Sequence, residues 1–99
     1  MSVSIVAHWK ARSGNAGTVA GILPDIARAS PAEPGCPAWT AGRSEREKNE
    51  FVLLEEYADH AAPAARQATA RYRELILEQV VPLLADRKVA RYRPAARRG

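Results

Sequence analysis

The sequence is poor in cysteine and in aromatic side chains. It has one cysteine, Cys36, and six aromatic residues in a chain of 99. A single cysteine can form neither an internal disulfide nor a cysteine-rich metal site, which favours a reducing compartment such as the cytoplasm. Because no eighteen apolar residues run together and the first residues lack a basic-then-apolar pattern, we expect neither a membrane span nor a secretory leader.

Acidic residues are missing from the end of the chain. No acid follows Asp86, whereas six of the fifteen Lys and Arg residues do. The first 86 residues carry nine bases and eleven acids, so the formal net charge of +4 belongs to the C-terminal end. We expect these cations to belong partly to a last strand and partly to a solvated tail, rather than to a nucleic-acid-binding surface.

Alanine is what the sequence has in quantity, with twenty residues. A chain of this length buries only about 65% of the surface that its unfolded form exposes. With so few large apolar side chains, its core is expected to need help from a partner subunit. We therefore predict one domain over residues 1–93, a basic tail over residues 94–99, and a homodimer.

The first half of the chain shows one strand pattern and one helix pattern. Residues 2–12 alternate, with Val3, Ile5, Ala7 and Trp9 on one face, which predicts a strand. Asn15 can cap a helix that runs to about Ser30, with Val19, Ile22, Leu23 and Ile26 at helical spacing. Pro24 lies inside that pattern and is expected to kink the helix or delay its start.

The second half predicts three further strands and more helix. Residues 36–44 are typical of a weak strand, and residues 51–59 of a strong one that places Phe51, Leu53, Glu55 and Tyr57 on one face. Asp59 can cap a short alanine-rich helix with Pro63 in its first turn. A helix from Thr69 carries Tyr72, Leu75, Ile76, Val80 and Leu83 on one side and ends near Pro82. Residues 89–93 predict a final short strand.

The order β-α-β-β-α-β indicates an α+β fold of the ferredoxin-like type. This fold has a four-stranded antiparallel sheet with helices on one face. The opposite face also carries apolar residues, so a second copy of the same sheet is the expected cover.

Short motifs along the chain resemble one enzyme family. They are Gly14, the run EPGC at 33–36, Arg43-Ser44, and the run FVLLEEYADHAAPAA at 51–65. In this order they resemble the antibiotic biosynthesis monooxygenases, which include quinol monooxygenases, over about residues 3–93. The resemblance implies a dimeric α+β barrel with an apolar pocket between the sheet and helices of each subunit. It also implies a cofactor-independent monooxygenase that oxidises a phenolic, hydroquinone or polyketide-like aromatic substrate with O2.

The sequence departs from the family at two positions. Family members commonly carry a pair of histidines where this chain has Arg66 and Arg71. Because a guanidinium stays protonated, neither arginine can act as a base, although Arg66 can anchor a phenolate or carboxylate. In the haem-degrading branch an Asn, a Trp and a His form the site, and this chain has Ala7, Arg66 and Ile76 there, which argues against haem degradation.

The candidate site residues lie on the faces predicted to look toward the helices. The catalytic candidates are Arg66, Glu55 and Tyr72, and the substrate-binding candidates are Trp9, Tyr57, Ala7 and Ile76. Glu55 is a base if its surroundings are apolar, or a structural partner if an arginine pairs with it. Trp9, Tyr57 and Tyr72 either line a pocket or pack in the core.

Several other residues have less specific interpretations. His8, on the face predicted for the dimer interface, and His60 lack further ligands at metal-binding spacing, so no metal or other cofactor is expected. Trp39 is expected in an interface or the core, and Cys36 as a buried inert thiol. Because the histidine pair is lost, a non-catalytic ligand-binding or accessory dimer, or an isomerase or cyclase, remains the alternative function.

Overall fold

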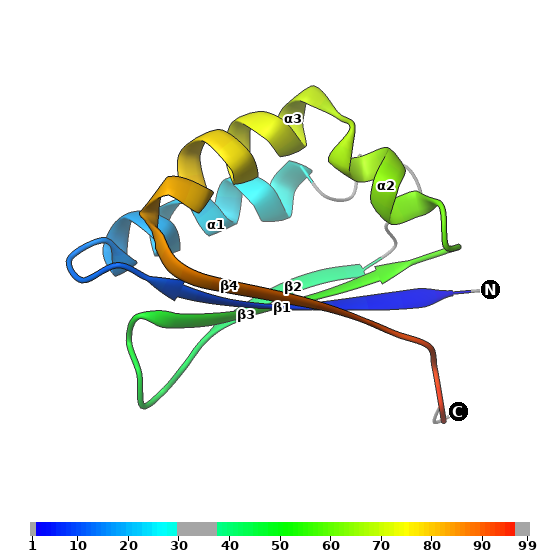
Figure 1. Cartoon of the computed structure of the whole chain (residues 1–99), viewed down its shortest axis with the longest axis horizontal. Helices are drawn as coiled ribbons and strands as arrows, with labels where there is room; N and C mark the ends of the chain where they lie inside the picture. The colour runs from blue at the N-terminus through cyan, green and yellow to red at the C-terminus, as the bar shows by residue number, and fades with distance from the viewer. Residues whose placement is uncertain (1, 30–37, 97–99) are drawn as a thin grey trace.

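The computed structural model describes residues 2–29 and 38–96, in which one antiparallel sheet lies beneath a layer of helices (Figure 1). The strands are β1 (Val3–Ala11), β2 (Ala38–Arg43), β3 (Glu50–Tyr57) and β4 (Leu84–Tyr92). The helical elements are α1 (Ala16–Ala29), α2 (Ala62–Gln67), α3 (Ala70–Tyr72), the π-helical η2 (Arg73–Val80) and the 3-10 turn η3 (Val81–Leu83). The EPGC run with Cys36 lies outside the described residues.

The strand order in the sheet is β2-β3-β1-β4, and each neighbouring pair is antiparallel. The two central strands, β1 and β3, pair in a register that sets Ile5 opposite Glu55 and Trp9 opposite Phe51. This order with helices on one face confirms the predicted α+β ferredoxin-like fold.

Helix α1 follows the predicted pattern but begins well before its proline. It starts at Ala16 and continues through Pro24 to Ala29, so Pro24 does not delay its start. Val19 and Ile26 are buried against the sheet, as the helical spacing predicted. Apolar burial along one face therefore outweighs the hydrogen bond that Pro24 removes.

The second helical region consists of several short pieces. The carboxylate of Asp59 accepts hydrogen bonds from the backbone N–H groups of Ala61 and Ala62, at 2.9 and 3.0 Å, and Pro63 lies in the first turn of α2. Thr69 caps α3, which continues into the wider π-helical turns of η2. The helix is thus interrupted at Ala68 and Thr69, so that α3 does not continue the axis of α2. We call this interruption the step between α2 and α3.

One strand starts earlier than its prediction, and part of another lies outside the described residues. β4 starts at Leu84, five residues before the predicted Val89, and β2 is described over Ala38–Arg43, while residues 36 and 37 of its prediction are not described. β4 is an edge strand that pairs with β1 alone, and only its first residue, Leu84, is buried. Because the other side chains of β4 are exposed, they do not show the alternation of apolar and polar residues by which a strand is recognised.

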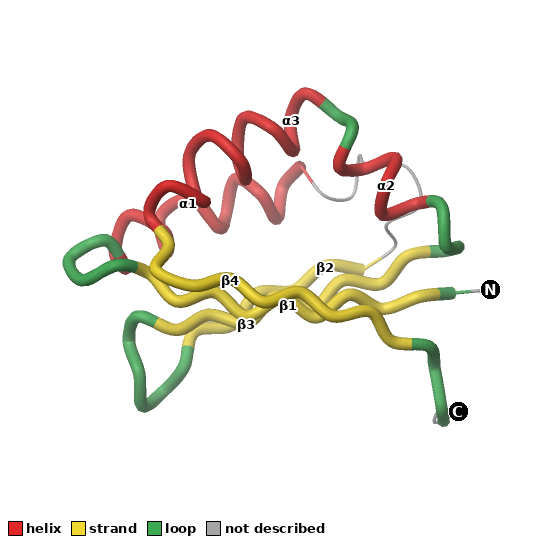
Figure 2. Tube along the Cα trace, in the orientation of Figure 1, coloured by secondary structure: helices red, strands yellow, loops and turns green. Residues whose placement is uncertain are grey.

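The two faces of the sheet have opposite environments. The face toward the helices carries the core, which includes Trp9, Phe51 and Leu53, and the half-buried Trp39 packs against it. No helix of the described chain covers the other face, where the β2–β3 turn and the segment after β4 bend away from the helices (Figure 2). His8, Leu54 and Tyr92 lie on this open face, and Leu54 and Tyr92 are about half exposed.

Among the described residues, no helix is long and apolar enough to cross a membrane.

Candidate active site

A cavity of about 470 Å³ lies between the sheet and the second helical region. Its walls come from β1, β3 and β4 below and from α2, α3 and η2 above. All seven residues predicted for the site line it: Ala7, Trp9, Glu55, Tyr57, Arg66, Tyr72 and Ile76. The structure thus brings together residues that are up to 69 positions apart in the sequence.

The apolar part of this cavity comes from positions with strict strand or helix periodicity. Ala7 and Trp9 alternate on β1, and Ile76 lies on the inner side of η2; all three are buried. The indole Nε1 of Trp9 is buried and has no hydrogen-bond acceptor among the described residues. The Trp9 side chain therefore offers the cavity an aromatic surface.

Strand β3 supplies two polar groups to the same cavity. Glu55 and Tyr57 are two residues apart, so both point toward the helices, and both are buried. The Tyr57 hydroxyl donates a hydrogen bond to Oε1 of Glu55. A carboxylate is thereby held beneath the helices rather than in water.

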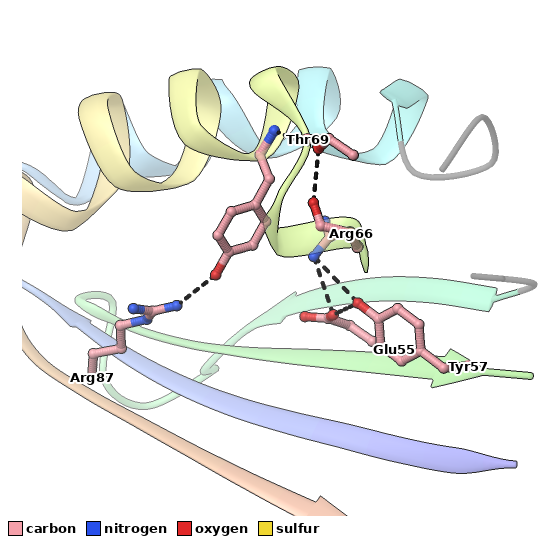
Figure 3. Close-up of polar contacts among 6 residues, drawn as sticks. Glu55, Tyr57, Arg66, Thr69 and Arg87 are labelled. Carbon is pink, nitrogen blue, oxygen red and sulfur yellow. Dashed lines mark hydrogen bonds and ion pairs between the residues drawn. The ribbon is translucent and has the colours of Figure 1, made fainter. Parts of the chain in front are cut away.

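Arg66 reaches this carboxylate from α2 (Figure 3). Its Nη1 lies 3.3 Å from Oε1 of Glu55 and 3.3 Å from the Tyr57 hydroxyl, and it donates to both. The side chains of Arg66 and Glu55 are only 5% and 9% exposed. Each charge therefore compensates the other where solvation by water is nearly lost.

Thr69 links the two helical residues of the site. Its hydroxyl donates to the backbone carbonyl of Arg66 at 2.8 Å and accepts from the backbone N–H of Tyr72 at 3.1 Å. The Arg66 guanidinium then lies 5.2 Å from the centre of the Tyr72 ring, which is within cation–π range. The step between α2 and α3 thus sets where both side chains enter the cavity.

The Tyr72 hydroxyl contacts an arginine from the last strand, β4. It accepts a hydrogen bond of 3.0 Å from Arg87. Its own proton is then available to an acceptor in the cavity, because a hydroxyl can accept and donate at once.

Three arginines that sequence reasoning did not single out also line the cavity: Arg73, Arg87 and Arg91. Arg87 and Arg91 alternate with Val89 on β4, on the face that looks toward the helices. The prediction began this strand at Val89, so Arg87 was outside it. The period of two would have placed Arg87 and Arg91 on the inner face only if the pairing of β4 with β1 had been known.

Other candidate residues lie elsewhere. His8 is on the open face, beside a second concavity of about 550 Å³ that Lys10, Val52 and Lys88 also line. His60 contributes its backbone carbonyl, which accepts a hydrogen bond from Arg91 at 3.1 Å. Within residues 2–29 and 38–96, no three His, Cys, Asp or Glu side chains are grouped as metal ligands.

The comparison with protein families agrees with this architecture. The family model described as antibiotic biosynthesis monooxygenase matches residues 2–76. The chain belongs to this family. The match covers β1 through the first half of η2, and so includes all seven predicted site residues.

Solved structures show the same fold at low sequence identity. Rv0793 from Mycobacterium tuberculosis is 22% identical, with a TM-score of 0.89 and all of both chains covered. PA3566 from Pseudomonas aeruginosa is 22% identical, with a TM-score of 0.86 over 96% of this chain and 95% of its own. SnoaB from Streptomyces nogalater, described as a cofactor-independent oxygenase, is 16% identical, with a TM-score of 0.84 over 97% and 95%. A comparison with curated proteins gave no significant match.

Proposed function

We propose that the protein is a cofactor-independent monooxygenase that oxidises a phenolic, hydroquinone or polyketide-like aromatic substrate with O2. The observation that carries this proposal is the Glu55–Tyr57–Arg66 network, which places an anchored cation and a carboxylate in a cavity that aromatic and aliphatic side chains also line. Membership of the monooxygenase family and the fold shared with a cofactor-independent oxygenase support it.

The chemistry needs little from the protein besides binding and charge. Once its acidic C–H or O–H proton is removed, an electron-rich aromatic anion can transfer an electron to O2, and the two radicals combine into a peroxide at carbon. For an anthrone, loss of water then converts the reacting CH2 into C=O. One atom of O2 ends in the product and the other in water. Desolvation and orientation of the anion in the cavity favour the electron transfer to O2.

Each site residue has a role in this scheme. Arg66 anchors the anionic oxygen of the substrate and stabilises charge that develops on oxygen, since its cationic side chain lines the cavity. Glu55 or Tyr72 takes and returns the proton. Trp9, Ala7 and Ile76 hold the aromatic body, and Tyr57 fixes the orientation of the Glu55 carboxylate.

A second candidate is a non-catalytic ligand-binding dimer. It is favoured by the ion pair itself, because Oε1 of Glu55 already accepts hydrogen bonds from Arg66 and Tyr57 and is therefore less free to accept a proton from a substrate. The histidines common in the family are also replaced, by Arg66 and Arg71. In this case the cavity would bind the same aromatic class without consuming O2.

Oxygen uptake separates these two functions. We expect the metal-free protein to accelerate O2 consumption by anthrones or hydroquinones over the buffer rate. Glu55→Gln or Tyr72→Phe, whichever removes the proton acceptor, should lower kcat about 100-fold or more. Glu56→Gln is the matched control, because Glu56 is the next carboxylate on β3 but faces away from the helices. Tight binding with no uptake across a broad phenolic panel would support the ligand-binding function instead.

We also propose that the protein is a homodimer in which two open sheet faces cover each other. The support is that this face carries half-exposed Leu54 and Tyr92 and has no helix over it in the described chain. Apolar side chains of this size gain free energy when a partner removes them from water.

A further inference from the structure

The mouth of the cavity is strongly cationic. Arg73 on η2 and Arg87 and Arg91 on β4 line it, and all three are exposed, unlike Arg66 inside. Two half-exposed apolar side chains, Leu77 on η2 and Val89 on β4, lie among them. A ligand that enters between η2 and β4 therefore meets both apolar surface and positive charge.

This charge is not neutralised by neighbouring acids. Glu55 is the only carboxylate among the described residues that line the cavity, and it is paired with Arg66. Arg87 donates to the Tyr72 hydroxyl and Arg91 to the carbonyl of His60, and both acceptors are neutral. No carboxylate within residues 2–29 and 38–96 forms an ion pair with Arg73, Arg87 or Arg91. The mouth thus retains a positive potential that attracts anions.

We propose that the ligand of this cavity is an aromatic acid with two ends, a carboxylate and a phenolic oxygen. The carboxylate lies at the mouth, where Arg73, Arg87 and Arg91 surround it. The ring system packs between Leu77 and Val89 and reaches Trp9, and the phenolic oxygen meets Arg66. This inference rests on the proposed function for the phenolic end, whereas the carboxylate end follows from the arginines alone.

The geometry distinguishes an acid from a neutral phenol. The guanidinium groups present N–H donors in a planar fork that matches a carboxylate, so an anionic end gains charge-assisted hydrogen bonds there. A neutral ligand of the same shape gains only the apolar contacts. A cavity of about 470 Å³ is also large enough for a fused-ring acid.

The test compares 6-hydroxy-2-naphthoate with 6-hydroxy-2-naphthamide, which differ in charge but hardly in shape. Dissociation constants come from calorimetric titration of the full chain. In about 20 mM salt the naphthoate should bind about tenfold more tightly, and about 500 mM salt should reduce this preference. Arg73→Gln combined with Arg91→Gln should weaken naphthoate binding about tenfold and change naphthamide binding less than about twofold.

Arg12→Gln is the control for a general change in net charge. Arg12 is exposed at the end of β1 and is not among the residues that line the cavity. It should leave both dissociation constants unchanged. Equal binding of the two probes, or a preference that survives loss of Arg73 and Arg91, would overturn the proposal.

Oxygen uptake keeps this proposal separate from the proposed function. Selective naphthoate binding with no uptake from any phenol would refute the monooxygenase and leave the acid-binding site in place. Consumption of O2 with the same KM for neutral and anionic phenols would support the monooxygenase and overturn the acid-binding site.

Discussion

At the scale of single residues, the contact between Arg66 and Glu55 determines what the cavity can do. The ion pair has both side chains at least nine-tenths buried, so removing one partner leaves the other charge in a poorly solvated place. The same contact gives Glu55 its orientation and leaves the Nε of Arg66 directed to no acceptor in the described chain. We therefore expect stability and ligand binding to depend on the same two residues.

A double-mutant cycle on this pair measures the dependence. Arg66→Gln is expected to lower the free energy of unfolding by about 3–5 kcal/mol, because Glu55 is left buried without its cation. Arg66→Gln with Glu55→Gln should cost clearly less than the sum of the two single changes. Denaturant unfolding monitored by circular dichroism gives these values.

The exposed pair of Arg28 with Asp25 is the control for that cycle. Arg28→Gln should cost about 0.5 kcal/mol or less, because water and salt screen this pair. Additive costs for Arg66 and Glu55 would contradict a coupled ion pair.

The sequence was enough to predict which residues line the cavity, but not which of them contact one another. The period of two on β1 and β3 was enough to place Trp9, Glu55 and Tyr57 toward the helices. It offered an arginine as one alternative partner of Glu55 but could not identify Arg66, because that contact depends on how α2 lies over the sheet. Arg87 was missed because its contact with Tyr72 requires the register of β4 against β1.

At the scale of elements, the step between α2 and α3 positions the site. Thr69 holds this step through one hydrogen bond to each side, and the π-helical turns of η2 then bring Arg73, Ile76 and Leu77 to the cavity. π-helical turns occur often at functional sites. The sequence predicted a helix from Thr69 but not its π character, since the apolar spacing alone does not distinguish the two.

Thr69→Val tests the step while keeping a β-branched side chain. It removes both hydroxyl contacts and should lower the free energy of unfolding by about 1 kcal/mol. Because Arg66 and Tyr72 lose their common anchor, affinity for an aromatic ligand should fall as well.

Thr18→Val on the exposed side of α1 is the matched control for Thr69→Val, and it should change neither quantity. Unfolding curves and calorimetric titration measure the two effects. Full affinity in Thr69→Val would show that the step does not depend on the cap.

At the scale of the whole molecule, the sheet separates two surfaces with different surroundings. The helix side holds the cavity, and Leu54, Tyr92 and His8 lie on the opposite side of the sheet, which no helix covers in the described chain (Figure 1). The scarcity of large apolar residues in the sequence fits a core that a second copy extends. The C-terminal charge has a more specific place than the sequence suggested, since Arg87 and Arg91 line the cavity.

Light scattering tests the dimer. At micromolar concentration we expect about twice the chain mass of 10.8 kDa. Leu54→Lys should shift the mass toward the monomer, because it sets a charge in the apolar face that the partner covers. Leu77→Lys, an equally exposed leucine on the helix side, should leave the dimer intact. A monomeric mass for the unmodified protein would refute the homodimer.

The most direct test of the central proposal is isotope labelling with 18O2. The metal-free protein is incubated with an anthrone, and the product is compared with that of buffer alone and of Glu56→Gln. We expect enzyme-dependent formation of a quinone that carries one 18O atom, while the second appears in water. A quinone whose new oxygen comes from water, or no acceleration over buffer with any anthrone or hydroquinone, would contradict it.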